Sequence, residues 1–141
     1  MAEPSPGFYN EVFDISRVFS RFINNNYNIE CVINQLSRLD QVLENYKEPF
    51  LTGNELAFCD IFLFVRLYCL QVVLKYFKNF TIPENMKRIN NLLSQLYSQQ
   101  VIRSSCPADQ DIIKQYSCYN QMRIPLSEWK FLNQVCFSFE N

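Results

Sequence analysis

Apolar residues recur at steps of three and four along most of the chain. Two such series precede residue 50, and this spacing places each on one face of an amphipathic helix. We therefore expect helices over about 8–23 and 29–46, with Asn28 available as the N-cap of the second. Because the connection between them is short, the two helices are predicted to form an antiparallel hairpin. The two series are Phe8, Val12, Ile15, Val18, Phe19, Phe22 and Ile23, then Ile29, Val32, Ile33, Leu36, Leu39, Leu43 and Tyr46.

The segment from about 57 to 78 is apolar on nearly every side and predicts a central helix. Its most apolar part, Ile61 to Leu74, is flanked by charged residues and contains Arg66. A bilayer span needs about 20 predominantly apolar residues, so this run is too short. We interpret it as a core helix and expect no stable membrane span. A loop at Thr52-Gly53-Asn54 precedes it.

Prolines mark the start of the later predicted helices. Pro83 is expected in the first turn of a fourth helix that carries Met86 to Tyr97, and Pro107 is expected to open a fifth. After Pro125, Ser127 is predicted to cap a short last helix carrying Trp129, Phe131, Leu132 and Val135. We find no strand-like alternation and predict an all-α fold. The expected organisation is one helical domain over 1–141, with a bundle at 8–120 and an aromatic-rich extension at 121–141.

The amino-acid composition excludes several classes of catalytic and binding site. The chain of 141 residues contains no His, which excludes His-based catalysis and nearly all catalytic zinc sites. Its net charge of −1 provides no overall basic field, so we expect no nucleic-acid partner. The six cysteines include no CxxC pair, and we interpret them as buried or half-buried free thiols. Free thiols are typical of a reducing compartment, and the N-terminus is unlike a signal peptide. Together these two features predict a cytoplasmic location.

Two blocks of residues carry a family resemblance. The segments Pro49–Met86 and Ser104–Tyr116 resemble the C-terminal helical domain of the chloride intracellular channel family, which is itself similar to omega-type glutathione transferases. The resemblance is strong over about 49–116 and is lost after about 120. It implies a glutathione-transferase C-terminal-type helical bundle around the helix at about 57–78. The matching residues are Phe50, Leu51, Gly53, Asn54, Glu55, Leu56, Asp60, Tyr76, Phe80, Ile82 and Pro83, then Cys106, Pro107, Asp109 and Tyr116.

The resemblance also implies how the central helix begins. In such domains a Ser or Thr caps the helix, an Asp at the third position completes a capping box, and two apolar residues form a staple. Here Asp60 is present and Leu56 with Ile61 can form the staple, but Ala57 has no side-chain oxygen. We therefore expect structural roles, at this helix start and at turns, for Gly53, Leu56, Asp60, Ile61, Pro83 and Pro107.

The family's reactive cysteine motif, glutathione site and channel-forming segment belong to a thioredoxin-like domain. This sequence has no Cys-Pro-x-Ser or Cys-Pro-x-Cys motif, and we expect no thioredoxin-like domain in it. We predict no catalytic, cofactor-binding or metal-binding residue, no enzymatic activity and no glutathione binding by this chain alone.

The leading hypothesis is a non-enzymatic protein-interaction or structural module, with a protein partner or a homo-oligomer. The alternative is part of a chloride channel, or of a glutathione-dependent transferase or reductase, whose N-terminal domain is absent from this chain. A candidate partner face is formed by Trp129, Phe131, Phe137 and Phe139. These aromatic residues can equally complete the core, and the sequence leaves that choice open.

Overall fold

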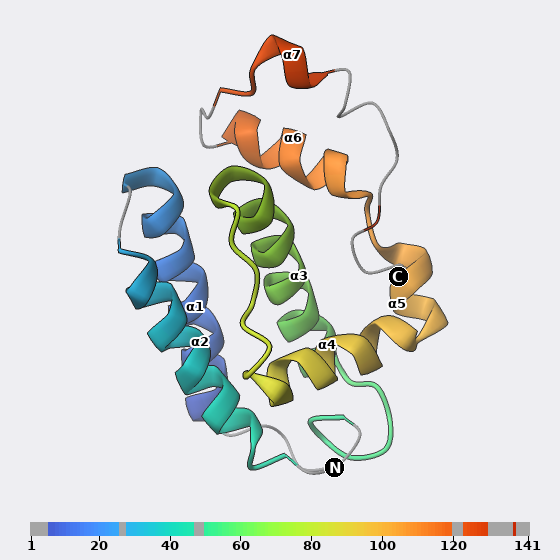
Figure 1. Ribbon diagram of the computed structural model, residues 1–141. Helices are drawn as coiled ribbons and strands as arrows, with labels where there is room; N and C mark the ends of the chain where they lie inside the picture. Colours follow the sequence, from blue (N-terminus) through green and yellow to red (C-terminus); the bar gives the residue numbers. More distant parts are fainter. Residues whose placement is uncertain (1–5, 26–27, 47–49, 120–122, 130–136, 138–141) are drawn as a thin grey trace.

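The computed structural model describes residues 6–25, 28–46, 50–119, 123–129 and 137. Within these ranges the chain is helical and contains no strand, which confirms the predicted all-α class (Figure 1). The helices are α1 (Pro6–Asn25), α2 (Ile29–Leu43), α3 (Phe58–Lys78), α4 (Lys87–Ser98), α5 (Gln100–Ser105), α6 (Asp109–Tyr119) and α7 (Leu126–Trp129).

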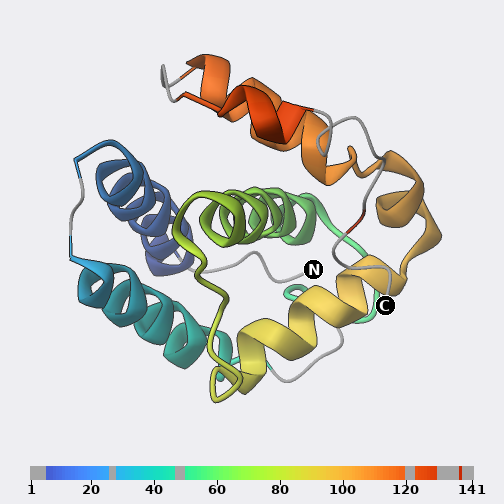
Figure 2. The ribbon, with the colours of Figure 1, turned by 45° about the horizontal axis from the view of Figure 1, so that its top comes forward.

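Helices α1 and α2 form the predicted antiparallel hairpin and lie side by side in both ribbon views (Figures 1 and 2). Their buried apolar residues follow the expected steps of three and four, from Phe8 to Ile23 in α1 and from Val32 to Leu43 in α2. Asn28 caps α2, since its side-chain oxygen accepts a hydrogen bond from the Glu30 N–H at 3.1 Å. Local pattern and capping chemistry therefore set this hairpin.

Helix α3 is the central helix, as predicted. It packs against α1, α4 and α6, so apolar residues on several of its sides are buried. Figure 2 shows α3 end-on between the α1–α2 hairpin, α4 and α6. The helix ends at Asn79, whose φ of 52° is left-handed. In the ranges that the structure describes, no helix combines the length and apolar character needed to cross a bilayer.

The predicted start of the fourth helix at Pro83 is wrong. Helix α4 begins at Lys87, because Pro83 belongs to a preceding turn whose geometry is fixed by hydrogen bonds. The Pro83 carbonyl accepts one bond from the Met86 N–H at 3.1 Å and another from the Asn90 side-chain amide at 2.9 Å. The pattern also missed α5, which is separated from α4 by the extended residue Gln99.

Two later helix starts also differ from the prediction. Pro107 lies two residues before α6, and the carbonyl of Ala108 accepts the first hydrogen bonds of that helix. Ser127 does not cap α7, because it lies inside the helix, where the Glu128 N–H donates to the carbonyl of Pro125 at 2.9 Å. The predicted continuation through Phe131, Leu132 and Val135 falls outside the described residues.

Candidate functional site

The start of α3 is organised by one buried carboxylate. Asp60 is fully buried, and its two oxygens accept hydrogen bonds from the N–H groups of Ala57 and Leu51, each at 2.9 Å. Ala57 is the N-cap and supplies no side-chain oxygen, so only the Asp60 half of the capping box exists. Both oxygens of Asp60 are thus held by backbone donors, which is consistent with the structural role expected for it.

The loop before α3 is closed by a tight turn at Gly53. Phe50 and Gly53 exchange two backbone hydrogen bonds, at 3.0 and 3.3 Å, and the φ of +136° at Gly53 favours a residue without Cβ. Asp60 holds the next residue of this turn, Leu51, against the helix start. Leu56 is half-buried against the core, whereas Ile61 is partly exposed, and the staple between them stays a prediction.

An apolar groove with a volume of about 180 Å³ lies between α3 and α5. We call it the α3–α5 groove. Three apolar side chains at its edge are exposed, Ile61 by 40%, Val65 by 51% and Val101 by 67%. Its full lining is Ile61, Phe64, Val65, Tyr68, Cys69, Val101, Ile102, Ser105, Cys106 and Pro107.

The polar groups of this groove are held or poorly reactive. The Tyr68 hydroxyl donates to the carbonyl of Pro107 at 3.2 Å, and burial raises the pKa of Tyr68. Burial also raises the pKa of the Cys69 thiol, against a smaller opposing effect of Arg66. The pKa of Cys106 is raised by burial and then by Cys69. Because the thiolate is the reactive form, these pKa values do not suit an enzymatic nucleophile at neutral pH.

The other described cysteines show that one part of the thiol prediction is wrong. Cys59 is buried and Cys31 is half-buried, as expected, but Cys118 on α6 is exposed. Its helix covers α3 from one side only, which leaves the outer face in solvent. Cys136 lies outside the described residues. No set of three or more His, Cys, Asp or Glu side chains within the described part of the chain is placed to hold a metal ion.

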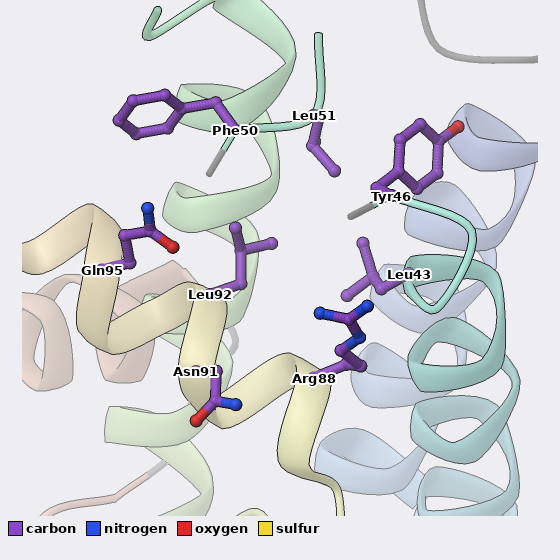
Figure 3. A pocket seen from close by; sticks show the side chains of 8 residues that line it. All are labelled: Leu43, Tyr46, Phe50, Leu51, Arg88, Asn91, Leu92 and Gln95. Atoms are coloured by element: carbon purple, nitrogen blue, oxygen red, sulfur yellow. The ribbon is translucent and has the colours of Figure 1, made fainter. Parts of the chain in front are cut away.

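A second cavity lies where the end of α2, the turn at residues 50–51 and α4 meet (Figure 3). Its volume is about 50 Å³. A space of this size holds only a few water molecules. The lining residues are Leu43, Tyr46, Phe50, Leu51, Arg88, Asn91, Leu92 and Gln95.

Three aromatic side chains form an exposed surface that we call the aromatic ridge: Phe13 of α1 and Phe58 and Phe62 of α3. The ring of Phe62 lies 5.6 Å from that of Phe13 and 6.0 Å from that of Phe58, measured between centroids. Phe13 is 53% exposed and Phe58 is 73% exposed. The Arg66 guanidinium lies 5.2 Å from the Phe62 centroid, which adds a cation to the surface.

Sequence reasoning missed the aromatic ridge because it treated the whole of α3 as core. One signal was available: Phe13 stands outside the buried stripe of Val12, Ile15 and Phe19.

The predicted partner face has a different outcome. Trp129 ends α7 and Phe137 is half-buried, whereas Phe131 and Phe139 fall outside the described residues. That face therefore stays a prediction.

Comparison with known proteins places this fold and these sites in context. No protein-family model matches the chain. It is 30% identical to "Chloride intracellular channel exl-1" of Caenorhabditis elegans over 105 residues, which are 74% of this chain and 44% of that protein. It is 26% identical to "Glutathione S-transferase DHAR2" of Arabidopsis thaliana over 92 residues, 60% of this chain and 43% of that protein.

A solved structure shows the same fold over nearly the whole chain. The crystal structure of the chloride intracellular channel homologue EXC-4 from C. elegans superposes with a TM-score of 0.84 at 23% identity. The match covers 97% of this chain and 55% of that one. The architecture is thus the helical domain of the glutathione-transferase and chloride-intracellular-channel type. The chain is similar to chloride intracellular channel proteins and spans about half of their length or less.

Proposed function

We propose that this chain acts as a non-enzymatic protein-interaction module and binds its partner through the aromatic ridge. The observation that carries the proposal is the exposure of Phe58 and Phe13 beside Phe62 on two neighbouring helices. Single exposed apolar side chains are ordinary, but aromatic rings in mutual contact at the surface mark an interaction site. The partner is either another protein or a second copy of this chain.

The chemistry of the ridge suits a protein partner. Aromatic residues and Arg are enriched among the residues that contribute most to protein binding. Arg66 stands over Phe62, so a partner that covers the rings also meets a cation on its border. The free thiols in the described part of the chain support a reducing, cytoplasmic location.

The cysteine chemistry supports the non-enzymatic part of the proposal. A glutathione-dependent reaction needs an activated thiolate or hydroxyl, and burial raises the pKa of the Cys69 and Cys106 thiols. The similarity to a glutathione transferase and to chloride intracellular channel proteins favours a second candidate. In that case the chain acts with a thioredoxin-like domain, in a transferase, reductase or channel, and the ridge faces that domain.

The test combines light scattering after size exclusion with binding of a hydrophobic dye. We expect the wild-type chain to self-associate or to bind the dye, and the double variant Phe13→Ser/Phe58→Ser to lose that behaviour while keeping its helical circular dichroism. The control is Asp111→Ser, at an exposed position of α6 that belongs neither to the ridge nor to the α3–α5 groove. A clean monomer that binds no dye contradicts the proposal.

A calorimetric titration with glutathione tests the non-enzymatic part separately. We expect no binding heat from this chain. Measurable binding by the chain alone overturns the non-enzymatic assignment and leaves the ridge experiment unaffected.

A further inference from the structure

The α3–α5 groove requires an apolar occupant. Its edge residues Ile61, Val65 and Val101 are exposed, and Cys69 and Cys106 lie in its lining. The hydroxyl of Tyr68 is already bonded to Pro107, so a charged group placed there would lose its hydration without gaining a strong partner. We propose that the occupant is the C-terminal segment of this same chain, residues 130–141.

The sequence of that segment has the required chemistry. No charged residue occurs from Phe131 to Phe139. Its end alternates, with Val135, Phe137 and Phe139 separated by Cys136 and Ser138. In an extended chain successive side chains point to opposite sides, so the three apolar residues share one side and can enter the groove together.

The helix before the segment is anchored at a suitable place. The Tyr76 hydroxyl donates a hydrogen bond to Glu128, which ties α7 to the C-terminal end of α3. Figures 1 and 2 show α7 running back along α6, so that its own C-terminal end points toward the side of the molecule where α5 lies. The C-terminal end of α7 is thus oriented toward the side of the molecule that holds the groove.

The length of the segment matches the distance to be covered. Val65 and Ile61 precede Tyr76 by eleven and fifteen residues on α3, which is about 16–23 Å at 1.5 Å per residue. Phe137 follows Trp129 by eight residues, and an extended chain of that length spans about 26–29 Å. Phe137 can thus reach the groove. Its side chain is half-buried, which shows that it packs against other residues.

The inference does not rest on the proposed function, because the groove and the aromatic ridge are formed by different side chains, although they adjoin on α3. Ile61 lines the groove, whereas Phe58 and Phe62 belong to the ridge. Removing the segment would extend the exposed apolar surface from the ridge to Val101 on α5. The segment therefore limits the surface that a partner can reach.

The native cysteines provide a direct test on the full chain. Cys136 lies in the segment, and Cys69 and Cys106 lie in the groove. A short bis-maleimide cross-linker should join Cys136 to Cys106 or Cys69 within one chain, in the monomer fraction, as identified by peptide mass spectrometry. Cys118, which is exposed on α6, is the internal control and should not be joined to Cys136. The link should disappear in Cys136→Ser.

The second measurement is the alkylation rate of Cys106. We expect the variant Phe137→Ser/Phe139→Ser to raise this rate about tenfold, because each buried ring contributes to holding the segment in place. Ser138→Ala, on the opposite side of the extended segment, should leave the rate unchanged. Equal Cys106 rates in wild type and the double variant, with no intrachain link, overturn the inference. Links found only between two chains overturn it too, because the occupant is then a second copy.

Discussion

Helix α3 is apolar along its length, but its exposed large apolar side chains lie in its N-terminal half. In the C-terminal half, Leu70, Val72, Val73 and Leu74 are buried among neighbouring helices. In the N-terminal half, one face with Leu63 and Leu67 is equally buried, whereas Phe58, Ile61 and Val65 on the opposite face are exposed. Apolar character along a helix therefore does not determine burial; the number of neighbouring helices does. This exposed face of the N-terminal half carries both the aromatic ridge and one wall of the α3–α5 groove, and it is there that we place the interactions of this protein.

The largest expected effect separates the two halves directly. Leu70→Ala should lower the free energy of unfolding by about 2–5 kcal/mol, because it leaves a cavity in a closely packed region. Phe58→Ala, at an exposed position of the same helix outside the α3–α5 groove, should change it by about 0.5 kcal/mol or less. Urea unfolding followed by circular dichroism measures both. Equal losses in the two variants would show that the exposed half is covered in solution.

The next effect concerns the carboxylate that fixes the exposed half. Asp60→Ala leaves the N–H groups of Leu51 and Ala57 without their acceptor, and should cost about 2–4 kcal/mol in unfolding free energy. Asp111→Ala is the matched control, since Asp111 also lies in a first helical turn but is exposed. A loss no larger than that of the control would mean that the helix start does not depend on Asp60.

The missing cap predicts a smaller gain of stability at the same helix end. Ala57 has the extended backbone of an N-cap but no oxygen, so Ala57→Ser should raise the unfolding free energy by about 0.5–2 kcal/mol. Thermal unfolding is measured at one pH for Ala57→Ser and for the double variant Ala57→Ser/Asp60→Ala. The comparison separates the stability contributed by the introduced hydroxyl from that contributed by the Asp60 carboxylate. A variant no more stable than wild type would show that the new hydroxyl does not reach the helix N–H groups.

The smallest effect tests the opposite end of α3. Burial, with the hydrogen bond to Glu128, raises the pKa of Tyr76 to about 12. Because the folded-state pKa exceeds the ordinary value of 10.0, the unfolded chain loses this proton first, and the contribution of Tyr76 to stability falls as pH rises from 10 to 12. Burial also raises the pKa of Tyr68 and Tyr116, so tyrosinate absorbance should show several late-titrating groups, one of which is lost in Tyr76→Phe and shifted to lower pH in Glu128→Gln. An unchanged titration in Glu128→Gln would argue against the α7 tether.

The site was only partly predictable, for reasons that differ between residues. Asp60 and Gly53 act on neighbours within ten residues, so motif and spacing were enough to expect their structural roles. The aromatic ridge joins Phe13 to Phe62, and the groove joins Ile61 to Val101. These pairs are distant in sequence, and no local pattern indicates that their helices meet at the surface. The start of α4 was misplaced because the Asn90 side chain bonds back to Pro83, a competition that helix propensity does not include.

The sequence by itself determined the all-α class, the α1–α2 hairpin, the identity of the central helix and the likeness to chloride intracellular channel proteins. Each depends on periodicity, capping residues or motifs that act over a few turns of chain. Only the tertiary structure decided which apolar side chains of α3 are left exposed and that Cys69 and Cys106 line one groove. Burial depends on how many helices surround a residue, and that number is a property of the packed molecule and not of any segment within it.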